Sequence, residues 1–130
     1  MSAAIFGIVN VTEDSFSDGG KYLEPGPAVA HARALIEAGA DAIDLGPASS
    51  HPDAARVSPD EEILRIAPII EALRADDIAV SVDSPLPETQ RFALGEGVAY
   101  LNDIHGFPDP SMYEALAASP ACLVVMHQIA

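Results

Sequence analysis

Short apolar runs alternate along the chain with longer segments of helical pattern. The runs are Ala3–Val9, Ala42–Leu45, Ile78–Val82, Val98–Leu101 and Cys122–Met126. They are almost continuously apolar, which is typical of strands buried on both faces of a parallel sheet. Strands that alternate with helices in this way predict an α/β fold in which the helices cover the sheet.

The segments between these runs carry helix start and stop signals. Helices are expected over about Pro27–Glu37, from Pro59 onward after a capping box at 58–61, over Pro87–Leu94, and from Asp109-Pro110 to about Ala118. In the second helix, one face is expected to be buried because apolar residues recur at helical spacing; these are Ile63, Ile66, Ile70 and Leu73. Pro68 lies inside that helix and should bend or split it, since proline lacks the backbone donor.

Polar side chains stand at the carboxyl end of each predicted strand. They are Asn10, Asp44, Asp83 with Ser84, Asn102 with Asp103, and His127. An open Rossmann-type sheet would share the alternation, but no G-x-G-x-x-G follows the first strand. A TIM-type (β/α)₈ barrel carries its active site at this end of its strands and needs about 250 residues. The 130 residues therefore predict the N-terminal half of such a barrel, an incomplete domain of about five parallel strands and four helices.

A polar loop follows the first apolar run. Eight of the eleven residues from Asn10 to Gly20 are Asn, Thr, Ser, Asp or Gly, and none is basic. The connection continues to Gly26, which is long for a compact domain, and long loops are more often functional or disordered. An ordinary connection made of turn residues remains the alternative.

The chain is strongly acidic, with 20 acidic and 6 basic residues and a net charge of −14. Nucleic acid is not an expected partner, because its binding needs clustered Lys and Arg and no two basic residues are adjacent here. A phosphate site would need a metal ion, helix N-termini or basic residues from elsewhere. Cys122 is the only cysteine and is expected to be a buried thiol in a reducing compartment. With no stretch long enough to span a bilayer, we expect a cytoplasmic protein without a membrane partner.

Three of the strand-end residues have chemistry suited to a polar ligand. Asn10 offers an amide oxygen to Mg²⁺ or to a phosphate-bound water, although it could simply bond its own loop. The Asp83 carboxylate could accept two N–H bonds from an amino-pyrimidine edge; the alternative is a helix cap for the segment after Pro85. The donors and acceptors of Asn102 could form hydrogen bonds with the same heterocycle beside Asp83.

The other strand-end residues have simpler explanations. Asp103 could only cap a turn, and Asp44 is most simply structural. His127 has no Cys or His neighbour in sequence with which it could form a metal-binding site, and a lone His is more often structural.

Several segments in this order resemble the first half of dihydropteroate synthase. They are residues 10–20 (Asn-Val-Thr-Glu-Asp-Ser-Phe-Ser-Asp-Gly-Gly), 81–84 (Ser-Val-Asp-Ser), 102–104 (Asn-Asp-Ile) and 126–127 (Met-His). The resemblance covers essentially the whole chain. It implies a pterin-binding (β/α)₈ barrel that joins p-aminobenzoate to 6-hydroxymethyl-dihydropterin pyrophosphate with Mg²⁺ in folate synthesis. It further implies that Asn10 binds Mg²⁺ and pyrophosphate, that Asp83 and Asn102 hold the pterin, and that Asn10 and Asp83 serve catalysis.

The second loop departs from the family pattern Gly-Gly-Glu-Ser-Thr-Arg-Pro-Gly-Ala. Residues 46–54 read Gly-Pro-Ala-Ser-Ser-His-Pro-Asp-Ala, so that Ser50 keeps the hydroxyl of the substrate-contacting Thr and His51 replaces the Arg. This variant is similar to the sulfonamide-resistant (Sul-type) synthases, and resistance is implied by that similarity. The resemblance also suggests a set of loop residues near p-aminobenzoate: Thr12, Asp14, Ser15, Phe16, Ser17, Ser49, His51 and Pro52.

Two alternatives to a synthase remain at this point. A pterin-binding methyltransferase domain would share the barrel and a pterin Asp and Asn, although residues 14–20 suit a pyrophosphate loop. A non-catalytic half-barrel would expose unpaired strand edges. Under the synthase hypothesis the partners are the two small-molecule substrates, a homodimer is an option for the full-length protein, and the 130 residues alone are expected to be inactive.

Overall fold

The described residues form one parallel sheet of five strands. The computed structural model describes residues 4–11, 25–46, 58–103 and 106–125. The strands are β1 (Phe6–Asn10), β2 (Ala42–Gly46), β3 (Ala79–Asp83), β4 (Tyr100–Asp103) and β5 (Cys122–Val125), and they lie in chain order. Because each strand runs parallel to the one before it, every connection must cross back outside the sheet. The predicted parallel α/β architecture is confirmed.

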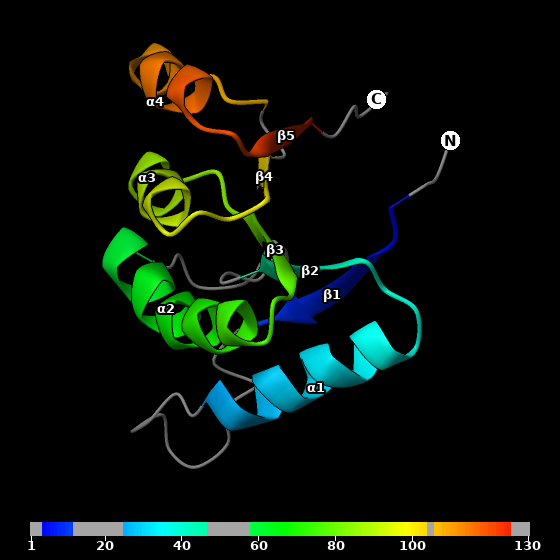
Figure 1. The fold of residues 1–130 in the computed structure, drawn as a ribbon. Coiled ribbons are helices and arrows are strands. Elements are labelled where there is room, and N and C mark those ends of the chain that lie inside the picture. Colours follow the sequence, from blue (N-terminus) through cyan, green and yellow to red (C-terminus); the bar gives the residue numbers. More distant parts are fainter. Residues whose placement is uncertain (1–3, 12–24, 47–57, 104–105, 126–130) are drawn as a thin grey trace, which may run out of the picture.

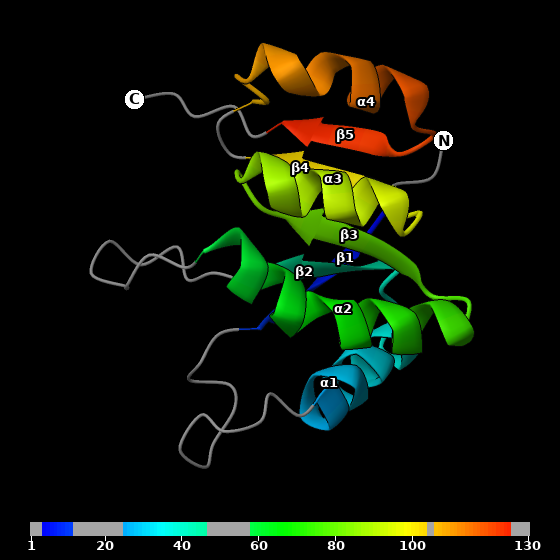
Figure 2. The same cartoon turned by 90° about the vertical axis from the view of Figure 1, so that its left-hand side faces the viewer.

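The described helices all cover one face of this sheet (Figure 1). They are α1 (Pro25–Glu37), α2 (Pro59–Ala75), α3 (Pro87–Gly95) and α4 (Tyr113–Ala118), the last preceded by the 3₁₀ turn η2 (Pro110–Met112). Figure 2 shows the arrowheads of β3 and β5 pointing the same way. A Rossmann-type sheet carries helices on both faces, whereas consecutive units of a (β/α)₈ barrel keep them on the outside. The arrangement is that of successive barrel units.

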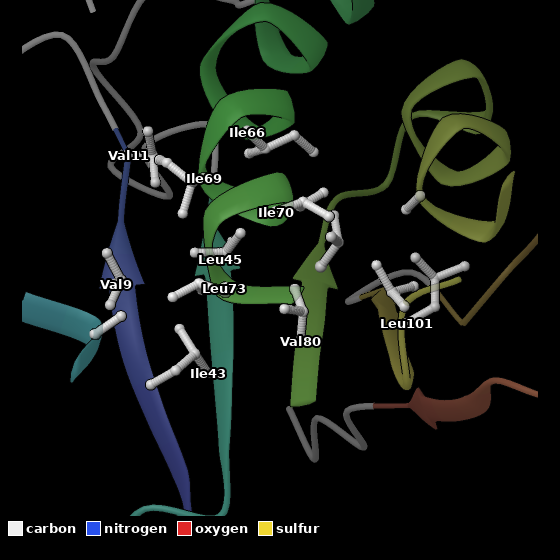
Figure 3. Close-up of a cluster of buried hydrophobic side chains, with 14 of the residues drawn as sticks. Val9, Val11, Ile43, Leu45, Ile66, Ile69, Ile70, Leu73, Val80 and Leu101 are labelled. Atoms are coloured by element: carbon white, nitrogen blue, oxygen red, sulfur yellow. The ribbon is translucent and has the colours of Figure 1, made fainter. Parts of the chain in front are cut away.

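The hydrophobic core fills the space between the helices and the sheet (Figure 3). Alternate residues of the strands, such as Val9 and Leu45, point toward α1 and α2 and are almost completely buried. From α2 they meet the side chains of Ile66, Ile69 and Leu73. Burial of each aliphatic side chain of this kind contributes roughly 1.5–3 kcal/mol, so this layer holds the strands in position.

Helix α2 differs from its prediction in two respects. It runs as one helix through Pro68 and is not split. Leu64, one turn before the proline, is 67% exposed, so the missing backbone bond falls on the outer side of the helix, where water can replace it. Ile69 is buried on the core face, whereas Ile63 is only half-buried. No helix within the described residues has the length and apolar character needed to cross a bilayer.

The sheet is curved. The rings of Phe6 in β1 and Tyr100 in β4 lie with their centroids 4.7 Å apart, at 60° to each other. Neighbouring strands of a flat sheet are about 4.8 Å apart, so side chains from the first and fourth strands would not meet on it. The small residues Ala42 and Ala79, on the strands between, leave room for this contact. The curvature agrees with the barrel prediction.

The prediction that Cys122 is buried is wrong, because the thiol is exposed. Cys122 begins β5, and among the described strands only β4 pairs with β5. The residue therefore lies at an edge, where apolar character in the sequence does not ensure burial.

Gly7 provides a test of the packing between β1 and α1. A Cβ added there would come 2.9 Å from Leu35 Cδ1 and 3.2 Å from Ile43 Cδ1. We expect Gly7→Ala to lower the free energy of unfolding by about 1–3 kcal/mol, the usual cost of overpacking a core. Gly95→Ala is the control, because no atom lies within 4 Å of its added Cβ, and it should be neutral or mildly stabilising. Urea unfolding of the purified protein measures both, and equal effects would show that the β1–α1 contact is looser than described.

Candidate functional site

The sheet has a polar inner face, meaning the face turned away from the helices. Strand side chains alternate between faces, so the neighbours of the core residues point inward. The inner face carries five polar side chains: Asn10, Asp44, Ser81, Asp83 and Asn102. Parallel strands present their carboxyl ends at the same edge, which is where barrel enzymes bind their ligands.

Three of the predicted site residues lie at the same level of the inner face. Asp83 is the register partner of Asn102 on the adjacent strand. Asn10 is the register partner of Gly46. The residues that directly precede Gly46 and Asp83 are also register partners, so Asn10, Gly46 and Asp83 lie at the same level of the sheet. Gly46 carries no side chain; a Cβ there would come 3.2 Å from Asn10 Oδ1. The strands therefore bring a carboxylate and two amides to one end of the inner face.

Asp44 does not lie at a strand end as predicted. Strand β2 continues to Gly46, so Asp44 is its middle residue, level with Ile8 and Ser81. Its side chain is buried, and among the described residues neither Asp44 Oδ1 nor Ser81 Oγ has a hydrogen-bond partner. Asn102 Oδ1 is a third buried oxygen of this kind. Such acceptors are costly to bury unless a donor reaches them, which indicates a site that awaits a ligand or further protein groups.

Burial and neighbouring acids make Asp83 an unusually weak acid. Desolvation is the main cause, and the charges of Asp44, Asp103 and Glu62 add to it, so the pKa of Asp83 rises from 3.8 to about 6. Burial also raises the pKa of Asp44, and the nearby Ser81 hydroxyl offsets part of that effect. Acidic groups this close to one another favour a ligand that brings N–H donors or positive charge to Asp83.

The alternative assignment of Asp83 as a helix cap does not hold. Helix α3 has Leu86 as its N-cap and makes no side-chain cap bond. The hydroxyl of Ser84 supports the start of the segment instead, since Ser84 Oγ accepts a hydrogen bond of 3.1 Å from the Leu86 amide. Asp83 therefore does not cap this helix and lies on the inner face beside Asn102.

Asp103 caps a turn, as its simpler interpretation predicts. Its Oδ2 accepts a 3.1 Å bond from the Phe107 amide, and its carbonyl accepts one of 3.0 Å from Gly106. Phe107 has a φ of 57°, which is uncommon for a residue with a side chain. Sequence reasoning missed two buried polar residues beside this turn, Glu62 and Gln90. Both lie on helices, where a polar residue is by default assigned to the solvent face.

The remaining candidates lie outside the described residues. These are Thr12, Asp14, Ser15, Phe16, Ser17, Ser49, Ser50, His51, Pro52 and His127. Within the described part of the chain, no three His, Cys, Asp or Glu side chains gather closely enough to hold a metal ion. Of the residues described, Asn10 is the one predicted as a Mg²⁺ ligand.

The chain belongs to the family of pterin binding enzymes, whose family model matches residues 6–129. It is 65% identical over 128 residues to dihydropteroate synthase type-2 of Escherichia coli, covering 98% of this chain and 47% of that protein. Identity to type-1 of the same organism is 54% over 123 residues, covering 95% of this chain and 44% of that protein. The predicted relationship is confirmed, and the chain spans about half the length of these curated relatives.

Solved structures agree with this assignment. Dihydropteroate synthase from Xanthomonas albilineans with 4-aminobenzoic acid matches with a TM-score of 0.84 at 41% identity, covering 97% of this chain and 47% of that one. The enzyme from Anaplasma phagocytophilum with bound 6-hydroxymethylpterin-monophosphate matches with a TM-score of 0.83 at 42% identity, covering 98% and 49%. The unclosed sheet thus corresponds to about half of a dihydropteroate synthase barrel.

The raised pKa of Asp83 predicts a pH-dependent difference between the wild type and Asp83→Asn. The folded protein holds the Asp83 proton more tightly than the unfolded chain, so this carboxyl stabilises the fold at low pH and loses that effect as the pH rises from 3.8 to about 6. The free energy of unfolding of the wild type minus that of Asp83→Asn should fall over this range, by at most ~1.4 kcal/mol per pH unit. It should be level above about pH 7. Urea unfolding across the pH range measures it, and a flat or rising difference would contradict the burial argument.

Proposed function

We propose that the full-length protein is a dihydropteroate synthase. It would condense 6-hydroxymethyl-7,8-dihydropterin pyrophosphate with p-aminobenzoate, giving dihydropteroate and pyrophosphate in folate biosynthesis. Membership of the pterin binding enzyme family and 65% identity to a type-2 synthase support this reaction. On this proposal, residues 1–130 are the N-terminal portion of the barrel domain.

The observation that carries the proposal is the pairing of Asp83 with Asn102 at the carboxyl end of the inner face. A pterin presents an exocyclic amine and a ring N–H side by side, and an ionised carboxylate can accept both bonds in one plane. With a pKa of about 6, Asp83 is mostly ionised at neutral pH. The Asn102 amide supplies one acceptor and two donors for the remaining polar edge of the ring. These two side chains bind and orient the heterocycle.

The reaction is a substitution at the pterin methylene carbon. The amine nitrogen of p-aminobenzoate forms a bond to this carbon, the carbon–oxygen bond to pyrophosphate breaks with its electron pair leaving on pyrophosphate, and the amine releases a proton. Residues that fix the pterin hold the carbon in line for attack, which lowers the entropic part of the barrier. On this proposal, the role of Asp83 in catalysis is to hold the ring that carries the electrophile.

We also propose that Asn10 is a ligand of Mg²⁺ and lies close to the pyrophosphate. Asn10 ends β1 at the level of the Asp83–Asn102 pair, and its amide oxygen is a hard neutral donor. Mg²⁺ commonly takes few protein ligands and completes its shell with water and substrate phosphates, so a single described donor fits this ion. When bound, the ion would neutralise charge on the leaving pyrophosphate. The described strands contain no Lys or Arg that could do so.

Further properties are proposed from the sequence resemblance. The variant loop with Ser50 and His51 supports a sulfonamide-insensitive synthase in which these loops, with Ser49 and Pro52, lie near the substrates. A cytoplasmic enzyme, a homodimer of the full-length protein and the absence of a nucleic-acid partner belong to the same proposal. Activity measured with and without a sulfonamide tests the insensitivity directly.

The proposed reaction is tested by assaying the full-length protein that carries this sequence. We expect it to form dihydropteroate from the two substrates, and to do so only with Mg²⁺ present. Residues 1–130 alone should form none, because the described strands lack basic residues for the pyrophosphate and leave the sheet unclosed. Chromatographic detection of dihydropteroate measures both. An inactive full-length protein that transfers a methyl group from a pterin instead would favour the methyltransferase alternative.

The role of Asp83 is tested by Asp83→Asn in the full-length protein. The amide would place an N–H group against the N–H donors of the pterin, so affinity for 6-hydroxymethylpterin monophosphate should fall by roughly 1.5–3 kcal/mol. Asp41→Asn is a charge-matched control, because Asp41 Oδ2 accepts its bond from the Ile5 amide at the opposite end of the sheet. Calorimetry measures both affinities. If Asp83→Asn bound the probe as tightly as Asp41→Asn, Asp83 would not belong to the pterin site.

A further inference from the structure

A buried hydrogen-bond network lies behind the proposed pterin site, on the helix side of the sheet. Its members are Glu62 of α2, Ser84, Gln90 of α3 and Asp103, and each is at most 1% exposed. Ser84 Oγ donates a bond of 2.6 Å to Glu62 Oε1. Gln90 Nε2 donates to the Ser84 carbonyl at 2.8 Å and to Asp103 Oδ2 at 3.0 Å. Gln90 thus uses both of its amide hydrogens within the network.

The network joins the two strand ends that carry the ligand-facing residues. Ser84 directly follows Asp83, and Asp103 directly follows Asn102. The Gln90 amide therefore ties together the residues next to each pterin contact, and the Ser84 backbone amide adds a 3.1 Å bond to the Asn102 carbonyl. Because neighbouring residues on a strand face opposite sides, fixing Ser84 and Asp103 also fixes the backbone from which Asp83 and Asn102 project.

We propose that Gln90, with Ser84 and Glu62, positions Asp83 and Asn102 for the pterin without touching it. This inference rests on the proposed function. Asp83 and Asn102 must both point their polar atoms at the edge of one planar ring. Hydrogen bonds weaken steeply with poor geometry, so only small displacements of these two side chains are tolerated. Loosening either strand end would therefore weaken pterin binding, while groups held by the loops are affected less.

Stability alone gives a weaker explanation of this arrangement. Buried carboxylates are costly to desolvate, and apolar side chains of similar size are often at least as stabilising. Glu62 and Asp103 also lie close enough to Asp83 to disfavour its ionisation, which works against an acceptor role. What the network supplies is a fixed hydrogen-bond geometry between two strands, which apolar packing would not provide.

The test compares Gln90→Met with Thr89→Val in the full-length protein. Methionine matches glutamine in length and removes the amide. Thr89 is equally buried on the same helix, but its Oγ1 has no hydrogen-bond partner within the described residues, so valine removes a polar atom without removing a described bond. Ser84→Ala is a second variant, for use if Gln90→Met does not fold. The probe is 6-hydroxymethylpterin monophosphate, with affinity measured by calorimetry and KM for p-aminobenzoate measured in the synthase assay.

We expect Gln90→Met, or Ser84→Ala, to bind the probe roughly tenfold more weakly than the wild type, a change of about 1.4 kcal/mol. KM for p-aminobenzoate should change less than twofold, and Thr89→Val should match the wild type in both. The positioning role alone would be overturned if the network variant bound the probe as tightly as the wild type, or if it lost no more affinity than Thr89→Val. It would also be overturned if KM for p-aminobenzoate rose by the same factor as the affinity for the probe fell. A wild type that does not bind the probe would overturn both this role and the proposed function.

Discussion

The in-register pairing of parallel strands is the constraint on which the site depends. Each described strand pairs, within the described residues, only with its neighbours in the chain, so a residue's position along its strand decides its level in the sheet. A shift of one residue in β3 would turn Asp83 toward the helices and bring Ser84 to the inner face. The core holds this register, because Val82 and Leu101 can be buried under the helices in only one of the two arrangements.

The same geometry brings acidic groups close together in a buried region, where their negative charges are unfavourable. Asp44, Asp83, Asp103 and Glu62 lie close enough together for the other three to raise the pKa of Asp83. Without a ligand this repulsion works against the fold, and a donor-rich ligand would relieve it. Stability and binding are therefore opposed at this position, as is common where a site is organised before its ligand arrives.

Much of the fold was predictable from the sequence, because continuous apolar runs and helix caps are local signals. Asp83 and Asn102 could be placed because each follows directly from such a run. Asp44 was misplaced by two residues, since Leu45 and Gly46 do not show where a strand stops. Glu62 and Gln90 could not be foreseen: their partners lie on other elements, and a polar residue on a helix gives no sign that it will be buried.

The contact between Phe6 and Tyr100 has a consequence for how such a chain is made. Both rings belong to the first hundred residues, so the bend of the sheet can be established while a longer polypeptide is still emerging from the ribosome. Strands synthesised later would then meet a surface already shaped to receive them. Completion of a barrel would then proceed by the addition of strands to a curved template rather than by the bending of a flat sheet.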